Sequence, residues 1–195
     1  MKRALILDYG VGNLKSVSNF LSHFYSQVEV GNSKKSIENA DMVVLPGVGS
    51  FRQCSRLLGE PSTKDALLRR HEGNSPILGI CIGFQLLSQG SEESKDSKGL
   101  SIFSGSVKRL NNGAAIGWKQ VKLTREISAK DDYFFFNHSF GYVDADATEK
   151  LFWDNEEKYY VVAIKNSTVG LQFHPEKSQK AGLDFFDDLI KNVWV

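Results

Sequence analysis

The stretch Pro76-Ile-Leu-Gly-Ile-Cys81-Ile-Gly-Phe-Gln85 decides how this chain folds. A short apolar run leads to a cysteine inside a Gly-x-Cys-x-Gly turn, and an amphipathic helical pattern follows at once. This order predicts a strand, a sharp turn and a helix, in which small flanking residues allow a strained bend that pushes the cysteine side chain into a cleft. The N-terminus of a helix also favours the thiolate over the thiol. Cys81 is therefore the candidate nucleophile.

The segment Gln172-Phe-His174-Pro-Glu176 supplies the base that such a thiol requires. His174 ends a predicted strand, and strand ends of α/β sheets present functional side chains. Pro175 turns the chain and places Glu176 close to the imidazole. A carboxylate there would orient the ring and stabilise it once it is protonated.

The other histidines and the second cysteine are weaker candidates. His23 and His71 lie on predicted helices among polar neighbours, and we expect them at the surface. His138, in Asn137-His-Ser-Phe140, is either a rival base or a histidine satisfied in a β-turn, and it lacks a nearby acid in the sequence. Cys54 lies on a predicted helix and is interpreted as a structural residue.

The order of the predicted elements indicates an α/β fold. Strands are expected at residues 4–7, 28–30, 42–45 and 77–80, and helices at 14–24 and 50–72, which predicts a parallel sheet with right-handed crossovers. A polar loop at 91–99 is followed by β-like segments at 106–110, 117–123, 133–136, 159–165 and 169–173, then a helix at 182–193. We therefore expect a doubly wound, mostly parallel open sheet with helices on both faces and an antiparallel β excursion in the second half. One domain is expected over residues 1–195.

The composition argues against several classes of function. With 24 basic and 23 acidic side chains, the chain gives no electrostatic reason to expect nucleic acid. Two cysteines are too few for a disulfide framework or a metal cluster, and we expect no metal and no cofactor. No stretch approaches the ~18 apolar residues of a membrane span. Because a reactive thiol survives best in a reducing compartment, we expect a soluble protein of the cytoplasm.

The segment Pro46-Gly-Val-Gly49 also ends a buried strand, and two interpretations are open for it. One is a tight turn. The other is an oxyanion hole, because glycines let a peptide N–H point at a developing negative charge, here from Gly47 and Val48. The second donor would be the N–H of Ile82, directly after Cys81.

Seven motifs, in order along nearly the full chain, resemble class I (triad) glutamine amidotransferases. Within that class they are most similar to the glutaminase subunits of imidazole glycerol phosphate synthases. The motifs are Asp8-Tyr-Gly-Val-Gly-Asn13, Leu45-Pro-Gly-Val-Gly-Ser50, Gly79-Ile-Cys-Ile-Gly-Phe-Gln85, Ser91-Glu-Glu93, Gly117-Trp118, His138-Ser139 and Gln172-Phe-His-Pro-Glu-Lys-Ser178.

The resemblance implies a covalent mechanism. Cys81 would attack the side-chain amide of glutamine, and His174 would act as base and then as acid toward the leaving ammonia. Glu176 would orient His174. The resulting γ-glutamyl thioester would be hydrolysed to glutamate.

The resemblance also implies which residues hold the glutamine. Gln85 and Glu93 match positions that bind it, Glu93 through the α-ammonium group. The backbone around His138, Ser139 and Phe140 would hold the α-carboxylate, and this role favours His174 as the base.

A partner is implied as well. Ammonia would pass through the partner's channel to an acceptor, in histidine biosynthesis a cyclase subunit with a (β/α)₈ barrel that forms a heterodimer with the glutaminase. Trp118 and Lys177 are expected near this interface. We also expect low activity of the isolated chain, because the oxyanion peptide at residues 46–49 would reorient only when the partner binds its ligand.

The sequence departs from the family pattern in ways that keep alternatives open. Phe84 and Ile82 replace a methionine and a leucine, which should leave the chemistry intact. Residues 114–119 read Ala-Ala-Ile-Gly-Trp-Lys where the family has roughly Pro-His-x-Gly-Trp-Asn, which admits a different partner: an ATP-dependent synthetase that amidates surface-polysaccharide sugars. A Cys-type α/β hydrolase is disfavoured, because its acid precedes its histidine. A non-catalytic binding module that keeps Cys81 for packing is the remaining alternative.

Overall fold

The structure is a computed structural model that describes residues 2–11, 14–121, 132–143, 150–154 and 159–194. The described helices are α1 (Lys15–Leu21), α2 (Lys34–Asn39), α3 (Phe51–Leu58), α4 (Pro61–Glu72), α5 (Ile82–Gln85), the 3₁₀ turn η1 (Pro175–Lys177) and α6 (Gln179–Asn192). The described strands are β1 (Arg3–Leu7), β2 (Gln27–Gly31), β3 (Met42–Leu45), β4 (Ile77–Ile80), β5 (Gly90–Ser91), β6 (Ser94–Lys98), β7 (Ser106–Arg109), β8 (Ala115–Val121), β9 (Asp132–His138), β10 (Phe140–Val143), β11 (Lys150–Asp154), β12 (Tyr159–Lys165) and β13 (Thr168–Leu171).

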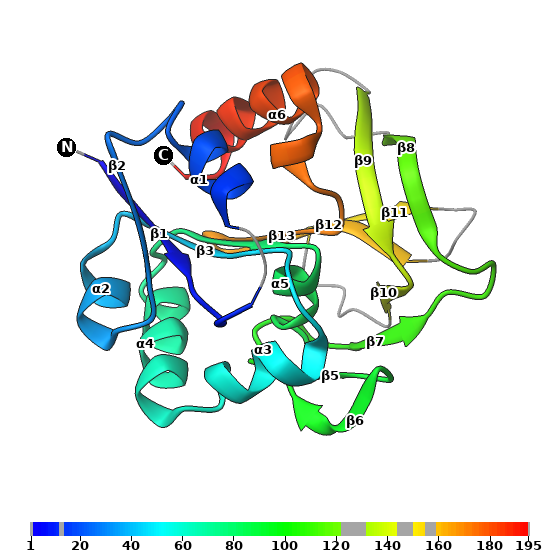
Figure 1. The fold of residues 1–195 in the computed structure, drawn as a ribbon, viewed down its shortest axis with the longest axis horizontal. Helices are drawn as coiled ribbons and strands as arrows, with labels where there is room; N and C mark the ends of the chain where they lie inside the picture. Colours follow the sequence, from blue (N-terminus) through cyan, green and yellow to red (C-terminus); the bar gives the residue numbers. More distant parts are fainter. Residues whose placement is uncertain (1, 12–13, 122–131, 144–149, 155–158, 195) are drawn as a thin grey trace.

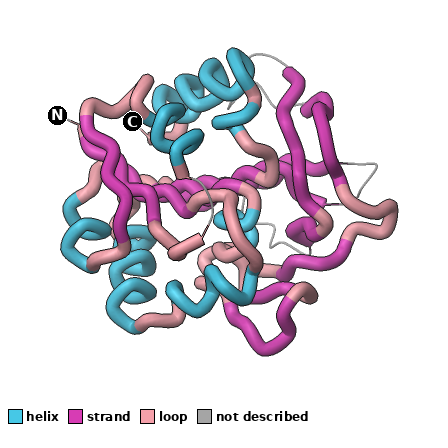
Figure 2. Tube along the Cα trace, viewed as in Figure 1, coloured by secondary structure: helices cyan, strands magenta, loops and turns pink. Residues whose placement is uncertain are grey.

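One large sheet organises the chain (Figures 1 and 2). Its strand order is β2-β1-β3-β4-β13-β12-β10-β7-β5-β6, and β11 pairs with β12 off this path. The pairs β1–β2, β1–β3, β3–β4 and β4–β13 are parallel. From β13 onward, β12, β10 and β7 follow in antiparallel pairs. The predicted parallel sheet with an antiparallel excursion is confirmed.

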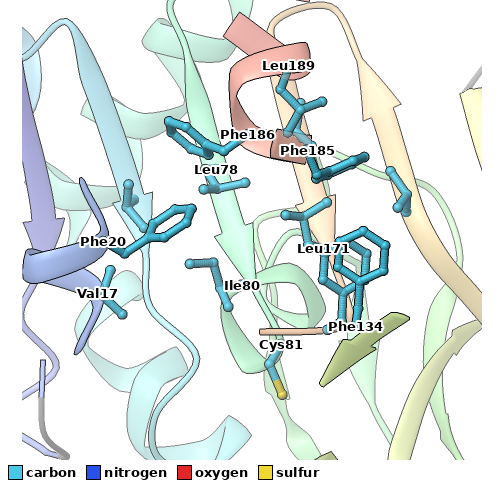
Figure 3. Packing of buried hydrophobic residues seen from close by; sticks show 14 of the residues in the cluster. Val17, Phe20, Leu78, Ile80, Cys81, Phe134, Leu171, Phe185, Phe186 and Leu189 are labelled. Atoms are coloured by element: carbon cyan, nitrogen blue, oxygen red, sulfur yellow. The ribbon is translucent and has the colours of Figure 1, made fainter. Parts of the chain in front are cut away.

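Helices cover both faces of the parallel half, and the strand residues alternate between them. Ala4 and Ile6 of β1 join the core under α1 and α6, whereas Leu5 and Leu7 join the core under α2, α3, α4 and α5. Figure 1 shows these two groups of helices on opposite sides of the sheet. A strand buried on both faces needs apolar residues without interruption, which explains the continuous runs in the sequence. Figure 3 shows the first of these cores, where Phe20 of α1 and Phe186 of α6 meet.

A separate hairpin stands beside this sheet. Strands β8 and β9 pair with each other in an antiparallel two-stranded sheet. Phe135 of β9 also forms a single bridge to His174, which follows β13. The hairpin therefore contacts the segment after β13 at His174, the candidate base.

Some predicted elements differ from those observed. The predicted loop at 91–99 is wrong, because β6 occupies most of it; a polar, charged strand is tolerated at the edge of a sheet. Helix α2 was not expected, and Ser33 caps its first turn by accepting from the backbone N–H of Ser36. The helix after Cys81 is a single turn. Residues 12–13 and 122–123 of the predicted turn and strand lie outside the described residues.

A buried arginine ties α4 to two neighbouring loops. Arg70 is 6 % exposed, and its Nη1 donates to the carbonyl oxygens of Ile37 (3.0 Å) and Ala40 (2.8 Å). Its Nη2 donates to the carbonyl oxygen of Pro76 at 3.1 Å, just before β4. The fork geometry of the guanidinium allows one side chain to reach four backbone acceptors, of which the Asp41 carbonyl oxygen, at 3.4 Å, is the fourth.

Replacing this arginine should destabilise the fold strongly. Arg70→Met leaves the Ile37 and Ala40 carbonyls without this donor, at ~1–3 kcal/mol for each unpaired group, so the free energy of unfolding should fall by about 2 kcal/mol or more. Arg69→Met is the matched control, because the Arg69 guanidinium contacts Glu38 in an exposed pair worth roughly 0–1 kcal/mol. Urea unfolding measures both variants, and equal losses would contradict this account.

Candidate active site

The candidate site lies where three adjacent parallel strands end. Strands β3, β4 and β13 pair side by side, so their carboxyl ends meet at one edge of the sheet. Gly47 follows β3, Cys81 follows β4, and His174 follows β13. The Cys81 backbone N–H donates to the carbonyl oxygen of Leu171 at 2.7 Å, which fixes the turn to β13. The predicted nucleophile and base are therefore neighbours.

Cys81 has the strained backbone that its flanking glycines predict. Its φ is 50° and its ψ is −106°, a conformation that residues with a side chain rarely adopt. A β-carbon on Gly83 would overlap the Leu45 carbonyl oxygen, and one on Gly79 would lie 2.7 Å from the Gly83 carbonyl oxygen. The glycines thus allow α5 to pack against the sheet backbone directly after the bend. Figure 3 shows the Cys81 sulfur pointing away from the hydrophobic cluster.

His174 interacts with both of its predicted partners. Its Nδ1 lies 2.8 Å from Glu176 Oε1, and the side chains of both residues are only 3 % exposed. Because a carboxylate can only accept, Nδ1 carries the hydrogen and donates it. Cys81 interacts with the same ring and raises the pKa of the imidazole. The three side chains form the chain Cys81–His174–Glu176 that the sequence predicts.

The electrostatics of this chain favour a protonated imidazole. Burial by itself lowers the pKa of His174. The interaction with Cys81 and the hydrogen bond to Glu176, together with the negative charges of both groups, outweigh burial and raise the pKa from 6.5 to about 9. An imidazolium beside a thiolate is the state in which a cysteine can attack and the histidine can donate to a leaving group.

Two further residues brace the site, and the sequence argument gave neither a role. Ser178 Oγ donates to the His174 carbonyl oxygen (2.6 Å) and accepts from the Phe135 N–H (3.0 Å), which joins the base to β9. Gln172 is fully buried, with Nε2 3.8 Å from Cys81 Sγ and Oε1 3.5 Å from Gln85 Nε2. Both belong to the motif around His174, but motif membership alone does not predict a contact.

A cavity of about 390 Å³ opens over Cys81. It contains most of the residues predicted for the site: Gly47, Cys81, Ile82, Gln85, Glu93, His138, Ser139, Phe140, His174 and Lys177. Glu176 lies behind His174, and Val48 is partly buried against the second core cluster. The larger cavity, of about 460 Å³ between α3, α4 and β6, contains none of the predicted site residues.

The predicted glutamine-binding residues are held by bonds of their own. Gln85 Nε2 donates to the Phe140 carbonyl oxygen at 2.8 Å, and His138 Nδ1 lies 2.8 Å from the same oxygen. Glu93 Oε2 accepts from the backbone N–H of Phe51, the first residue of α3, at 3.2 Å. The roles of these residues stay predictions, but all of them face one cavity.

Trp118 and Lys177 are brought together on the hairpin side of this cavity. Lys177 Nζ lies 5.7 Å from the centre of the Phe135 ring, and Trp118 contacts the same ring edge to face at 6.0 Å. Trp118 is 48 % exposed and Ile116, on the cavity wall, is 68 % exposed. An exposed apolar strip therefore borders the opening.

Three observations concern other parts of the chain. His23 is exposed as expected, but the surface prediction for His71 is wrong: it is half-buried, with Nδ1 2.8 Å from Thr168 Oγ1. Among the described residues, no group of three His, Cys, Asp or Glu could hold a metal ion. No helix among the described residues is long and apolar enough to cross a membrane.

Comparison with known proteins identifies the family. A family model described as glutamine amidotransferase class-I matches residues 5–191. The chain therefore belongs to the class I glutamine amidotransferases and is an enzyme of that class.

Its relatives and structural neighbours are consistent with this. The HisH subunit of imidazole glycerol phosphate synthase from Aquifex aeolicus is 37% identical over 201 residues, which cover 98% of this chain and 97% of that protein. HisH from Pyrococcus furiosus is 38% identical over 193 residues, covering 94% and 95%. A crystal structure of a glutamine amidotransferase matches with a TM-score of 0.77 at 16% identity, covering 98% of this chain and 99% of that chain. The structure of PurLQS from Thermotoga maritima gives 0.76 at 16% identity, covering 97% and 98%. The two structures share the fold.

The raised pKa of His174 gives a direct test of the site. The imidazole ¹³Cε1 resonance should titrate with a midpoint at about 9, and Glu176→Gln should lower it because a pKa-raising charge is lost. Since the folded protein holds this proton more tightly than the unfolded chain, the associated stability is complete below pH 6.5 and is lost as the pH rises through about 9. The melting-temperature advantage of the wild type over His174→Gln should shrink across that window. A melting-temperature difference that does not change with pH, or a titration midpoint of His174 near 6.5, would contradict the pairing of His174 with Glu176 and Cys81.

Proposed function

We propose that this chain is the glutaminase subunit of an imidazole glycerol phosphate synthase, and that it forms one glutamine amidotransferase domain. It hydrolyses glutamine to glutamate and ammonia, and the ammonia is used by a cyclase partner in histidine biosynthesis. The observation that carries the proposal is the buried Cys81–His174–Glu176 chain at a cavity of about 390 Å³. The HisH relatives, which match almost the whole chain, support the choice of partner.

The proposed reaction begins with the thiolate of Cys81 attacking the side-chain carbonyl carbon of glutamine. The negative charge that develops on the carbonyl oxygen is stabilised by the backbone N–H groups of Val48 and Ile82. His174 gives its proton to the amide nitrogen as the C–N bond breaks, which releases ammonia and leaves a γ-glutamyl thioester. His174 then takes a proton from water, which attacks the thioester and releases glutamate and the thiolate.

The binding roles follow from the groups that line the cavity. The carboxylate of Glu93 pairs with the α-ammonium group of glutamine, and its tie to the first turn of α3 keeps it in place. The backbone around Ser139 and Phe140 holds the α-carboxylate. Gln85 acts beside them, since its amide already contacts Phe140.

The partner is proposed to dock on the hairpin side of the cavity as the second subunit of a heterodimer. The exposed side chains of Ile116 and Trp118, with Lys177 beside them, border the opening from which ammonia has to leave. Covering this strip would guide ammonia into the partner's channel and keep it from water. The cyclase subunit carries the lyase step of the synthase. The need for a free Cys81 thiol supports a location in the reducing cytoplasm.

Glutamate release by the purified chain tests this function. Activity should be low alone and should rise on the order of 10²-fold with a cyclase subunit and its nucleotide ligand, because one oxyanion donor is worth ~10²–10³ in rate. Cys81→Ala should abolish both activities while leaving the chain folded.

The outcomes separate the candidate partners. Fast, partner-independent hydrolysis would contradict the proposed activation. Weak, Cys81-dependent hydrolysis that ignores the cyclase would favour a sugar-amidating synthetase as partner. If this chain restores growth without histidine in a strain that lacks its own glutaminase subunit, the sugar-amidating alternative is excluded.

A further inference from the structure

The second cysteine, Cys54, contacts the loop at residues 46–49 directly. Its side chain lies on the first turns of α3 and is fully buried. Its Sγ donates to the Val48 carbonyl oxygen at 3.3 Å. The same sulfur would lie 3.0 Å from a β-carbon on Gly49, so it forms one wall of the slot that holds the loop. A residue expected only to fill space is thus bonded to the backbone beside the site.

The loop is constrained at both of its glycines. A β-carbon on Gly47 would lie 2.7 Å from His174 Cε1 and 3.1 Å from Cys81 Cβ. The Gly47 end of the loop therefore lies against Cys81 and His174, the reacting pair of the proposed mechanism. Gly49 is exposed and has a φ of +97°, and a β-carbon on it would lie 2.9 Å from Val11 Cγ2 and 3.0 Å from Cys54 Sγ. Such a φ is accessible to glycine with little cost. Cys54 therefore lies at the end of the loop opposite to the reacting pair.

The bonded carbonyl is adjacent to the peptide proposed as the oxyanion donor. The donor is the N–H of Val48, in the peptide that joins Gly47 to Val48. The Val48 carbonyl belongs to the next peptide, and the two planes share the Val48 α-carbon. If the Val48–Gly49 peptide is held in place, the Val48 α-carbon is held as well. The Gly47–Val48 peptide can then rotate only about that fixed atom, which limits the directions in which the Val48 N–H can point.

Cys54 is suited to be a permanent donor. Burial, and then the negative charge of Glu93, raise the pKa of its thiol to about 12. The sulfur therefore keeps its hydrogen at neutral pH. The first turn of α3 also carries the capping box of Ser50 and Gln53, so the donor stands on a well-anchored turn.

We infer that Cys54 is a positioning residue for the oxyanion hole: its thiol anchors the Val48–Gly49 peptide, so that the neighbouring Gly47–Val48 peptide can turn its N–H toward the substrate oxygen when the partner binds. This inference rests on the proposed glutaminase function. A thiol is a weak donor, so its effect is smaller than the loss of the oxyanion donor itself. It acts through the backbone and does not touch glutamine.

The test compares two substitutions that differ in one hydroxyl group. Cys54→Ala removes the hydrogen-bond donor, and Cys54→Ser replaces the thiol by a hydroxyl, a donor on a side chain of similar size. In the presence of the cyclase subunit, we expect Cys54→Ala to lower kcat for glutamine roughly three- to tenfold with KM unchanged, against ~10²–10³ for a lost oxyanion donor. Cys54→Ser should stay within about twofold of the wild-type kcat.

Two further measurements exclude a general structural effect. Alkylation of Cys81 by iodoacetamide needs the thiolate but no oxyanion hole, so its rate should be the same in Cys54→Ala and the wild type. Ile37→Val removes one buried methylene from the same core cluster and should lower the melting temperature with kcat unchanged.

The possible results separate a failure of this inference from a failure of the proposed function. Equal kcat values for Cys54→Ala and the wild type would overturn the inference alone, as would equal losses in the Ala and Ser variants or a slower alkylation of Cys81. A wild-type chain that releases no glutamate with the cyclase would overturn the proposed function and this inference with it.

Discussion

The close backbone approach between α5 and the sheet is the constraint on which the rest of the site depends. Gly83 lies against the Leu45 carbonyl, and the Phe84 ring lies on Gly170, where any side chain would overlap it. Only with α5 this close can Cys81 hold a φ of 50° at the end of β4. The bend directs the sulfur out of the core and toward His174. Burial of apolar residues on both faces of the sheet thus stabilises a strained cysteine.

A second constraint is the electrostatic one at His174. Burial of the ring opposes its protonation, yet Glu176 and Cys81 together raise its pKa to about 9. A buried charge is tolerable because its partners are equally buried and bonded to it. Ser178 and the bridge from Phe135 hold the backbone of the histidine, so the hairpin is bonded to the backbone of the candidate base.

The sequence allowed the parallel half of the fold and the proximity of Cys81, His174 and Glu176 to be predicted because their signals are local. Cys81 and His174 each follow an apolar strand, and parallel strands place such ends together. The edge strand β6 and helix α2 could not be predicted in the same way, since their few residues carry no clear periodicity. The contact of Gln172 with Gln85 joins segments far apart in the chain, and that of Cys54 with Val48 spans six residues across the turn into α3. They depend on packing, which residue patterns do not encode.

Cys81 is proposed to carry the glutamyl group during turnover. Acid quenching of the chain while it turns over glutamine with the cyclase subunit, followed by proteolysis and mass spectrometry, tests this directly. We expect a glutamyl thioester on the peptide that contains Cys81 and none on the peptide that contains Cys54. Glutamate release without any adduct on Cys81, or an adduct on another residue, would contradict this proposal.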